Sequence, residues 1–182
     1  MNITVIDGGT RKGGNTEVLT NYALMECEYN KIDLRDYDIR PVVDYRHSES
    51  GFPEVGDEYN DVIDQVLRSD IVVFATPIYW FGMSGLMKNF IDRWSQTMRD
   101  DRYPDFKHQM AQKKMYVIAV GGINPSIKGL SLIQQFQYIF DFIGAEFAGY
   151  VLGQANKPGE IEGDRKALLA AKQLISNLEV KG

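Results

Sequence analysis

Four short apolar runs most strongly limit what this chain can fold into. ITVI (3–6), IVVFAT (71–76) and MYVIAV (115–120) are β-branched or aromatic and nearly continuous, and FAGYVLG (147–153) is a fourth run with an internal glycine. Continuous apolar runs are typical of parallel strands that are covered on both faces of a sheet. The short segment KIDL (31–34) fits an edge strand. The sequence therefore predicts a parallel sheet of five strands.

Helical patterns alternate with these runs. Apolar residues recur with a period of about 3.6 residues, as on one face of a helix, between consecutive predicted strands and after the last one. These stripes lie at 18–25, 62–67, 83–94, 130–143 and 168–178. The alternation predicts a three-layer α/β fold. Five strands with right-handed crossovers that start from the centre most often take the order 2-1-3-4-5.

Length and composition indicate one domain. The chain has 182 residues, a net charge of -5 and one cysteine. This length predicts a single domain, 1–182. The negative charge disfavours a nucleic-acid-binding surface. A single cysteine excludes an intrachain disulfide. No run approaches the ~18 apolar residues of a membrane span. We expect a cytoplasmic protein with no nucleic-acid partner.

Two unusual loops should meet in the predicted fold, because loops after the first and third strands of this order flank a crevice. The first, GGTRKGGNT (8–16), has the spacing of a nucleotide phosphate loop, G-x-x-x-x-G-K-[ST], read from Gly9, but Asn15 stands in place of the lysine. An NTPase needs that lysine and an acidic magnesium site, and the third strand ends without an acid. The loop therefore favours a terminal monophosphate. An ordinary strand-to-helix turn is the alternative.

Several residues of the first loop could hold such a phosphate. Glycines allow close approach of the backbone, and a helix that starts near Asn15 or Thr16, both good N-caps, would offer free N–H groups. Arg11 and Lys12 add positive charge. The candidate residues are Gly9, Thr10, Arg11, Gly14, Asn15 and Thr16.

The second loop, TPIYWFGMSG (76–85), places three bulky aromatics directly after a buried strand. Core aromatics normally lie in regular elements, so Tyr79, Trp80 and Phe81 must be partly exposed or must cover something flat. A planar aromatic ring with polar edges fits such a loop. The alternative is that the triplet packs between helices or against a second subunit.

Three motifs together resemble those of the NAD(P)H-dependent FMN reductases and related flavodoxin-like quinone reductases: GGTRKGGNTEVL (8–19), DIVVFATPIYWFGMSGLMKNFIDRW (70–94) and VGGINPS (120–126). The resemblance covers nearly the whole chain and implies a flavodoxin-like three-layer sandwich. It implies that the FMN phosphate lies on Thr10, Arg11, Asn15 and Thr16. The flavin ring would be lined by Pro77, Ile78, Tyr79, Trp80, Phe81 and Gly82 and approached at its other edge by Gly121, Gly122 and Ile123.

The resemblance also implies an activity, that of an FMN-dependent oxidoreductase in which NAD(P)H reduces the flavin and electrons pass to a small acceptor such as a quinone. Since the cofactor performs the chemistry, no catalytic acid or base is expected; backbone N–H groups of 80–82 or 121–123 would stabilise charge on the reduced ring. A non-enzymatic electron carrier of the flavodoxin type and a flavin-containing, protein-binding regulator are the alternatives.

Family members are usually dimers or tetramers, so the resemblance implies a homodimer or homotetramer. The segment 37–59, with four aromatics, would cover the flavin or join a neighbouring subunit. His47 and His108 lie in predicted loops, where solvated side chains are expected.

The chain departs from the family in two places. Relatives commonly have serine and proline where Gly9 and Thr10 stand, so a serine hydroxyl is missing from the phosphate site unless Thr10 replaces it. Some relatives carry an iron–sulphur segment after the second strand, but 36–54 contains no cysteine. Electron transfer through such a cluster is therefore excluded.

Overall fold

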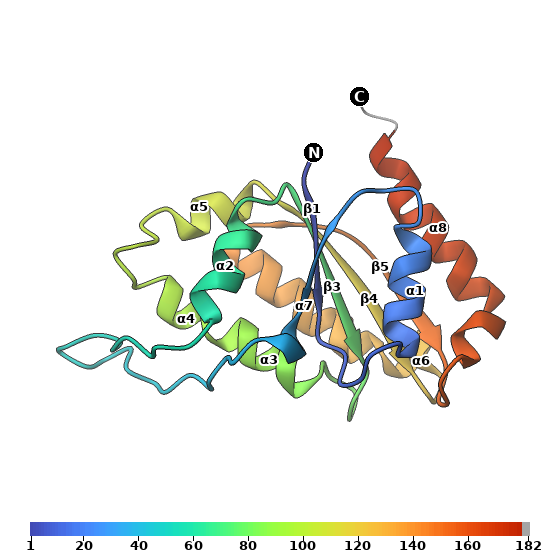
Figure 1. Cartoon of the computed structure of the whole chain (residues 1–182), viewed down its shortest axis with the longest axis horizontal. Coiled ribbons are helices and arrows are strands. Elements are labelled where there is room, and N and C mark those ends of the chain that lie inside the picture. The colour runs from blue at the N-terminus through green and yellow to red at the C-terminus, as the bar shows by residue number, and fades with distance from the viewer. Residues whose placement is uncertain (180–182) are drawn as a thin grey trace.

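A parallel sheet forms the centre of the computed structural model, which describes residues 1–179 (Figure 1). Its strands are β1 (Ile3–Asp7), β2 (Asn30–Asp33), β3 (Ile71–Pro77), β4 (Lys114–Gly121) and β5 (Glu146–Gln154). All neighbours pair in parallel, and the order is β2-β1-β3-β4-β5. The predicted five strands and their order 2-1-3-4-5 are confirmed.

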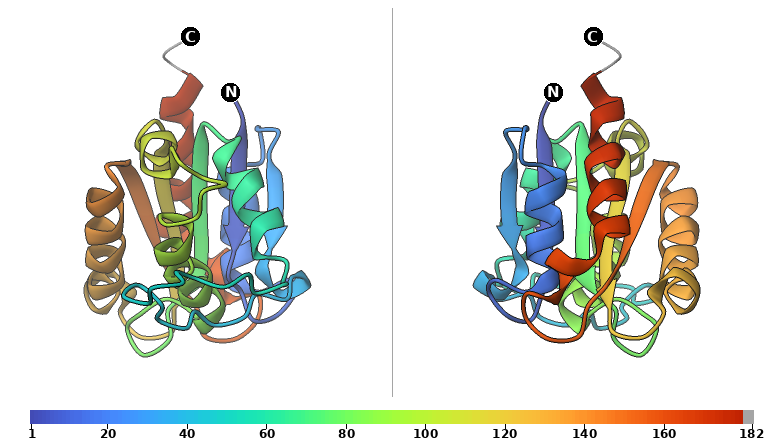
Figure 2. Two further views of the ribbon diagram at one scale, coloured as in Figure 1. Left: turned by 90° about the vertical axis from the view of Figure 1, so that its left-hand side faces the viewer. Right: turned by 90° about the vertical axis from the view of Figure 1, so that its right-hand side faces the viewer.

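Helices cover both faces of the sheet (Figure 2). One face carries α1 (Asn15–Ala23) and α8 (Arg165–Glu179). The other carries α2 (Tyr59–Leu67), α3 (Gly85–Asp92), α4 (Trp94–Thr97), α5 (Phe106–Ala111) and α7 (Leu130–Ile143). The short elements are α6 (Pro125–Lys128) and the 3-10 turns η1 (Leu34–Asp36) and η2 (Glu160–Gly163). The three-layer α/β prediction is therefore confirmed.

Alternate residues of each strand build the two separate cores. In β3, Val72 and Phe74 pack toward α2–α5 and α7, whereas Val73 and Ala75 pack toward α1 and α8. Phe74 is fully buried, and its ring lies 5.3 to 6.2 Å from three other aromatic rings. Both faces of the strand are thus dry, which explains why its sequence is continuously apolar.

Two expectations need correction or lie outside the described chain. The sequence predicts a loop at His108, but this residue lies in α5. Both His108 and His47 are exposed, as predicted. The last predicted stripe includes Ile175 and Leu178, whose side chains lie outside the described residues. Among residues 1–179, no helix combines the length and the apolar character needed to cross a membrane.

The segment 37–58, between η1 and α2, forms no helix or strand and extends sideways near the carboxyl ends of the strands (Figures 1 and 2). A buried ion pair fixes its far end: Arg93 Nη1 donates to Asp57 Oδ2 over 2.5 Å, and the two side chains are 1% and 2% exposed. Arg93 also donates to the carbonyl of Arg40 and lies over the Tyr59 ring. One guanidinium therefore holds both ends of this long segment.

The ion pair gives a test of stability and its pH dependence. Burial raises the pKa of the Asp57 carboxyl, but hydrogen bonds from Arg93 and from the backbone of Arg40 outweigh burial, so its pKa lies below 3.8. We expect Asp57→Asn to lower the free energy of unfolding at neutral pH by about 3–5 kcal/mol, because Arg93 loses its partner. A carboxyl group whose pKa is lower in the folded than in the unfolded state stabilises the fold at pH values above the unfolded-state pKa. This stabilisation is lost as the pH falls through the folded-state pKa. The difference in the free energy of unfolding between the wild-type protein and Asp57→Asn should therefore become smaller below pH 3.8.

Urea denaturation at neutral and acidic pH measures both effects. The matched control is Lys88→Met, which breaks an ion pair whose side chains are 53% and 38% exposed. It should cost less than about 1 kcal/mol. Equal losses in the two variants, or a gap that does not change with pH, would contradict the assignment.

Candidate functional site

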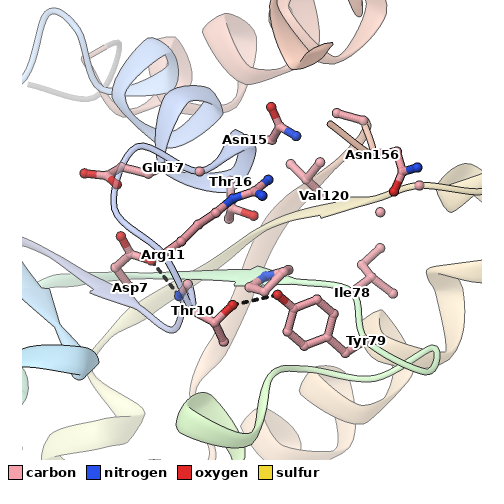
Figure 3. Close-up of a pocket in the computed structure, with 16 residues that line it drawn as sticks. Asp7, Thr10, Arg11, Asn15, Thr16, Glu17, Ile78, Tyr79, Val120 and Asn156 are labelled. Carbon is pink, nitrogen blue, oxygen red and sulfur yellow. Dashed lines mark hydrogen bonds between the residues drawn. The ribbon is translucent and has the colours of Figure 1, made fainter. Parts of the chain in front are cut away.

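A cavity of about 320 Å³ opens above the carboxyl ends of β1, β3 and β4 (Figure 3). Small-molecule sites commonly have volumes of roughly 300–1,000 Å³. The first loop, the second loop and the end of β4 all contribute to it. Its lining residues are Asp7, Gly9, Thr10, Arg11, Gly14, Asn15, Thr16, Glu17, Pro77, Ile78, Tyr79, Val120, Gly121, Gly122, Ala155 and Asn156.

The two loops are held together by direct contacts. Gly8 N donates to Ala75 O over 2.8 Å, and Ser84 Oγ donates to Gly8 O over 2.6 Å. A Cβ atom on Gly8 would lie 2.9 Å from Ser84 Oγ and from the Cβ atom of Met87. Only glycine therefore allows this approach, because that separation is shorter than a van der Waals contact. The convergence of the two loops that the sequence predicts is observed.

A side-chain contact joins the loops across the cavity. Thr10 Oγ1 and the Tyr79 hydroxyl lie 2.7 Å apart, and the two side chains point toward each other (Figure 3). Thr10 thus supplies a polar group at this end of the cavity. Its hydroxyl already has a partner in the second loop.

The start of α1 differs from the prediction that Asn15 or Thr16 caps it. Gly14 is the N-cap residue, and no side chain caps the helix. The Asn15 amide turns away to the loop after β5, donating to Lys157 O over 2.8 Å and accepting from Gly159 N over 3.0 Å. The side chain of Asn15 thus fixes the far wall of the cavity, and its backbone N–H points from the helix terminus as a donor for a ligand.

The first turn of α1 makes this end of the cavity suited to an anion. The N–H groups of Asn15, Thr16 and Glu17 have no partner within the helix, and the helix dipole adds positive potential there. Arg11 extends past Gly14 toward Thr16 (Figure 3). Within residues 1–179 no carboxylate pairs with Arg11. A guanidinium, backbone N–H groups and the Thr16 hydroxyl therefore surround one small volume.

Asp7 explains why glycine stands at position 9. Its side chain is 2% exposed, and its Oδ1 accepts a hydrogen bond from Gly9 N over 2.8 Å. A Cβ atom on Gly9 would lie 2.9 Å from that same oxygen. The carboxylate thus occupies the space that a side chain at position 9 would need.

The second loop is a tight hairpin with a strained backbone. Tyr79 and Gly82 exchange backbone hydrogen bonds of 3.0 and 2.9 Å, with Trp80 and Phe81 at the tip. The tip residues have φ angles of 49° and 67°, which bulky L-residues rarely adopt. Trp80 is 95% exposed, so its side chain leaves the cavity open.

The structure divides the candidate residues between two neighbouring hollows. The cavity itself brings together Gly9, Thr10, Arg11, Gly14, Asn15, Thr16, Pro77, Ile78, Tyr79, Gly121 and Gly122. Trp80, Phe81 and Ile123 line an adjoining hollow of about 280 Å³, which shares Ile78, Gly121 and Gly122 with the cavity. Gly82 lines neither, because it closes the hairpin.

Five lining residues were missed by sequence reasoning: Asp7, Glu17, Val120, Ala155 and Asn156. Glu17 and Val120 lie within the quoted motifs and Asp7 directly precedes the first, so all three could have been included on that ground. Ala155 and Asn156 follow β5, and the sequence there has no signal that distinguishes it from an ordinary loop. The segment 37–58 and both histidines do not line the cavity.

Comparison with known proteins gives consistent matches. The family model described as NADPH-dependent FMN reductase matches residues 1–149. A Bacillus subtilis protein, provisionally named as an NAD(P)H-dependent FMN-containing oxidoreductase, is 57% identical over 175 residues, which cover 96% of this chain and 97% of the relative. An FMN-dependent NADH:quinone oxidoreductase of Colwellia psychrerythraea is 24% identical over 160 residues, 79% of this chain and 80% of the relative.

A solved structure agrees with the fold described above. The Trp repressor binding protein from Bacillus subtilis is 50% identical and superposes with a TM-score of 0.79. The match covers 96% of this chain and 97% of that one. The similarity thus extends over nearly the whole of both chains.

The contact between Asp7 and Gly9 can be tested by adding one methyl group. We expect Gly9→Ala to lower the free energy of unfolding by about 1–3 kcal/mol, since the buried carboxylate cannot move freely to admit the new atom. Gly163→Ala is the matched control, because a Cβ atom there meets nothing within 4 Å. Thermal and urea unfolding of both variants measure the difference. Equal stability of the two variants would contradict the proposed reason for glycine.

Proposed function

The chain belongs to the NADPH-dependent FMN reductase family, and we propose that it uses NAD(P)H to reduce bound FMN and passes the electrons to a small aromatic acceptor such as a quinone. The observation that carries the proposal is the convergence of an anion-binding loop and an aromatic loop on one cavity. The family supplies the type of reaction. The quinone follows from the name of the Colwellia relative.

The residues present fit FMN. The N-terminus of α1, Arg11 and Thr16 form a donor set that matches a terminal phosphate. The cavity lining includes no lysine for a triphosphate, and its two acids, Asp7 and Glu17, are bound to Lys31 and to loop N–H groups. At the other end, Pro77–Tyr79 and Gly121–Gly122 line the cavity. A Cβ atom on Gly121 would lie 3.1 Å from Ile78, so glycine keeps this space open.

The protein's part in the reaction is to bind and orient. When bound, FMN supplies a ring that accepts and returns reducing equivalents. The backbone of the second loop fixes the position of one ring edge. The N–H of Gly82 is already bonded to Tyr79 O. Of the predicted donors, those of Trp80, Phe81 and 121–123 are therefore the candidates to stabilise negative charge at the ring.

The adjoining hollow is the proposed place of the acceptor. Trp80, Phe81 and Ile123 are 95%, 51% and 73% exposed and give it apolar walls. An aromatic acceptor would gain stacking area there. This position beside Gly121 and Gly122 would bring the acceptor next to the ring.

Oligomeric state and location are further parts of the proposal. We expect a homodimer or homotetramer, because α6 and α7 expose the apolar side chains of Ile127, Leu130, Tyr138 and Phe142. A cytoplasmic location is consistent with the proposed nicotinamide substrate.

Reduction of the bound flavin by NADPH tests the activity. The purified protein, loaded with FMN and mixed anaerobically with NADPH, should lose its visible flavin absorbance and regain it when benzoquinone is added. Continuous NADPH oxidation in the presence of the quinone would separate an enzyme from an electron carrier. A protein that binds no FMN, or bound FMN that neither NADPH nor NADH reduces, would refute the proposal.

Arg11 gives a separate test of the phosphate site. A hydrogen bond to an ionised group is worth about 1.5–3 kcal/mol, so Arg11→Met should raise the Kd of FMN by about 10-fold or more. Riboflavin lacks the phosphate, and its Kd should stay the same. Arg99→Met removes an exposed guanidinium elsewhere and serves as the control. Flavin fluorescence titration measures these constants, and equal weakening of both flavins would place the phosphate elsewhere.

A further inference from the structure

Asp7 presents a charge problem for the proposed phosphate site. Its carboxylate lies in the cavity wall at the end of β1 and is almost completely buried. One oxygen holds the Gly9 N–H, so the carboxylate cannot be removed without loosening the first loop. A phosphate in the cavity would carry the same sign of charge, and repulsion between like charges is strong where water is excluded.

One lysine lies against this carboxylate from the side away from the cavity. Lys31 projects from β2, and its Nζ is 3.2 Å from Asp7 Oδ2. Lys31 does not line the cavity, and its side chain is 28% exposed. The ammonium therefore compensates the charge of Asp7 without occupying space that a ligand needs.

A second carboxylate holds the ammonium in place. Lys31 Nζ donates to Glu17 Oε1 over 2.5 Å, while Glu17 Oε2 accepts from Gly13 N over 2.6 Å. Burial lowers the pKa of Lys31, but its hydrogen bonds to Glu17 and Asp7 outweigh burial and raise it. Lys31 therefore keeps its charge at neutral pH.

The resulting chain of contacts connects both ends of the first loop. Gly9 is held by Asp7 and Gly13 by Glu17, and the two carboxylates share the same ammonium. The strand register places Lys31 beside Val5, two residues before Asp7. The long Lys31 side chain can therefore extend to the Asp7 carboxylate.

We propose that Lys31 is a positioning residue that makes the first loop compatible with a phosphorylated flavin, by neutralising the buried Asp7 carboxylate that holds Gly9. The inference rests on the proposed function, since it needs FMN to be the ligand. It assigns to Lys31 the preference for FMN over riboflavin. Lys31 does so without touching the ligand.

The first test compares two flavins on one variant. Lys31→Met should raise the Kd of FMN by about 10-fold, equivalent to 1.4 kcal/mol, because an uncompensated carboxylate then faces the phosphate. The Kd of riboflavin should change less than about 2-fold, since no phosphate is present to be repelled. Lys88→Met, which removes the same charge from an exposed pair on α3, should change neither constant.

A double variant separates the charge effect from a general loss of structure. Asp7→Asn keeps an oxygen that can accept from Gly9 N but removes the negative charge. In Asp7→Asn/Lys31→Met the Kd of FMN should return to within about 3-fold of the wild-type value. Glu17, which also lines the cavity, loses Lys31 in both the single and the double variant, so the difference between them reports on Asp7. If Lys31→Met alone does not fold, the double variant is compared with Asp7→Asn.

The outcomes distinguish this inference from the proposed function. A wild-type protein that binds no FMN refutes the function itself. Wild-type binding of FMN, together with equal weakening of FMN and riboflavin in Lys31→Met, or no recovery in the double variant, overturns the role of Lys31 alone.

Discussion

The close approach of the first and second loops at Gly8 is the constraint on which the site depends. Ser84 begins α3 and at the same time donates to the carbonyl of Gly8, so the helix after β3 starts where the loop after β1 passes. The parallel pairing of β1 with β3 brings the two chain segments together. A residue larger than glycine at position 8 would separate them, and the cavity would lose one wall.

The electrostatics of the first loop follow from that packed arrangement. The shape of the loop is held by two carboxylates of the cavity wall, Asp7 and Glu17, which accept hydrogen bonds from its backbone. Such anchors carry negative charge into a region where the helix terminus and Arg11 favour an anion. The lysine that a nucleotide phosphate loop carries is absent from the loop, and another lysine, from β2, lies behind it. The two lysines have different roles. A lysine in the phosphate loop would contact the ligand, whereas Lys31 contacts the Asp7 carboxylate.

The sequence predicts the architecture well because the architecture depends on repeated, local patterns. The apolar runs predict the ends of the strands to within one or two residues. The predicted strand order also places the loops after the first and third strands side by side. Contacts between distant residues could not be foreseen. Asn15 has its partners in a loop more than 140 residues away, and Lys31 reaches Asp7 only because of the strand register. The outward placement of Trp80 depends on a hairpin that propensity disfavours, since glycine is the usual residue at such φ angles.

The hairpin at Trp80 and Phe81 has a consequence for any molecule that approaches it. Its backbone is confined by paired hydrogen bonds at Tyr79 and Gly82, so the tip is already shaped before an encounter. A flat partner that rests on the exposed indole would not have to order this part of the main chain, and that saving in entropy would favour association. The unfavourable φ angles of Trp80 and Phe81 therefore destabilise the folded chain, but they leave a smaller loss of backbone entropy when a partner binds.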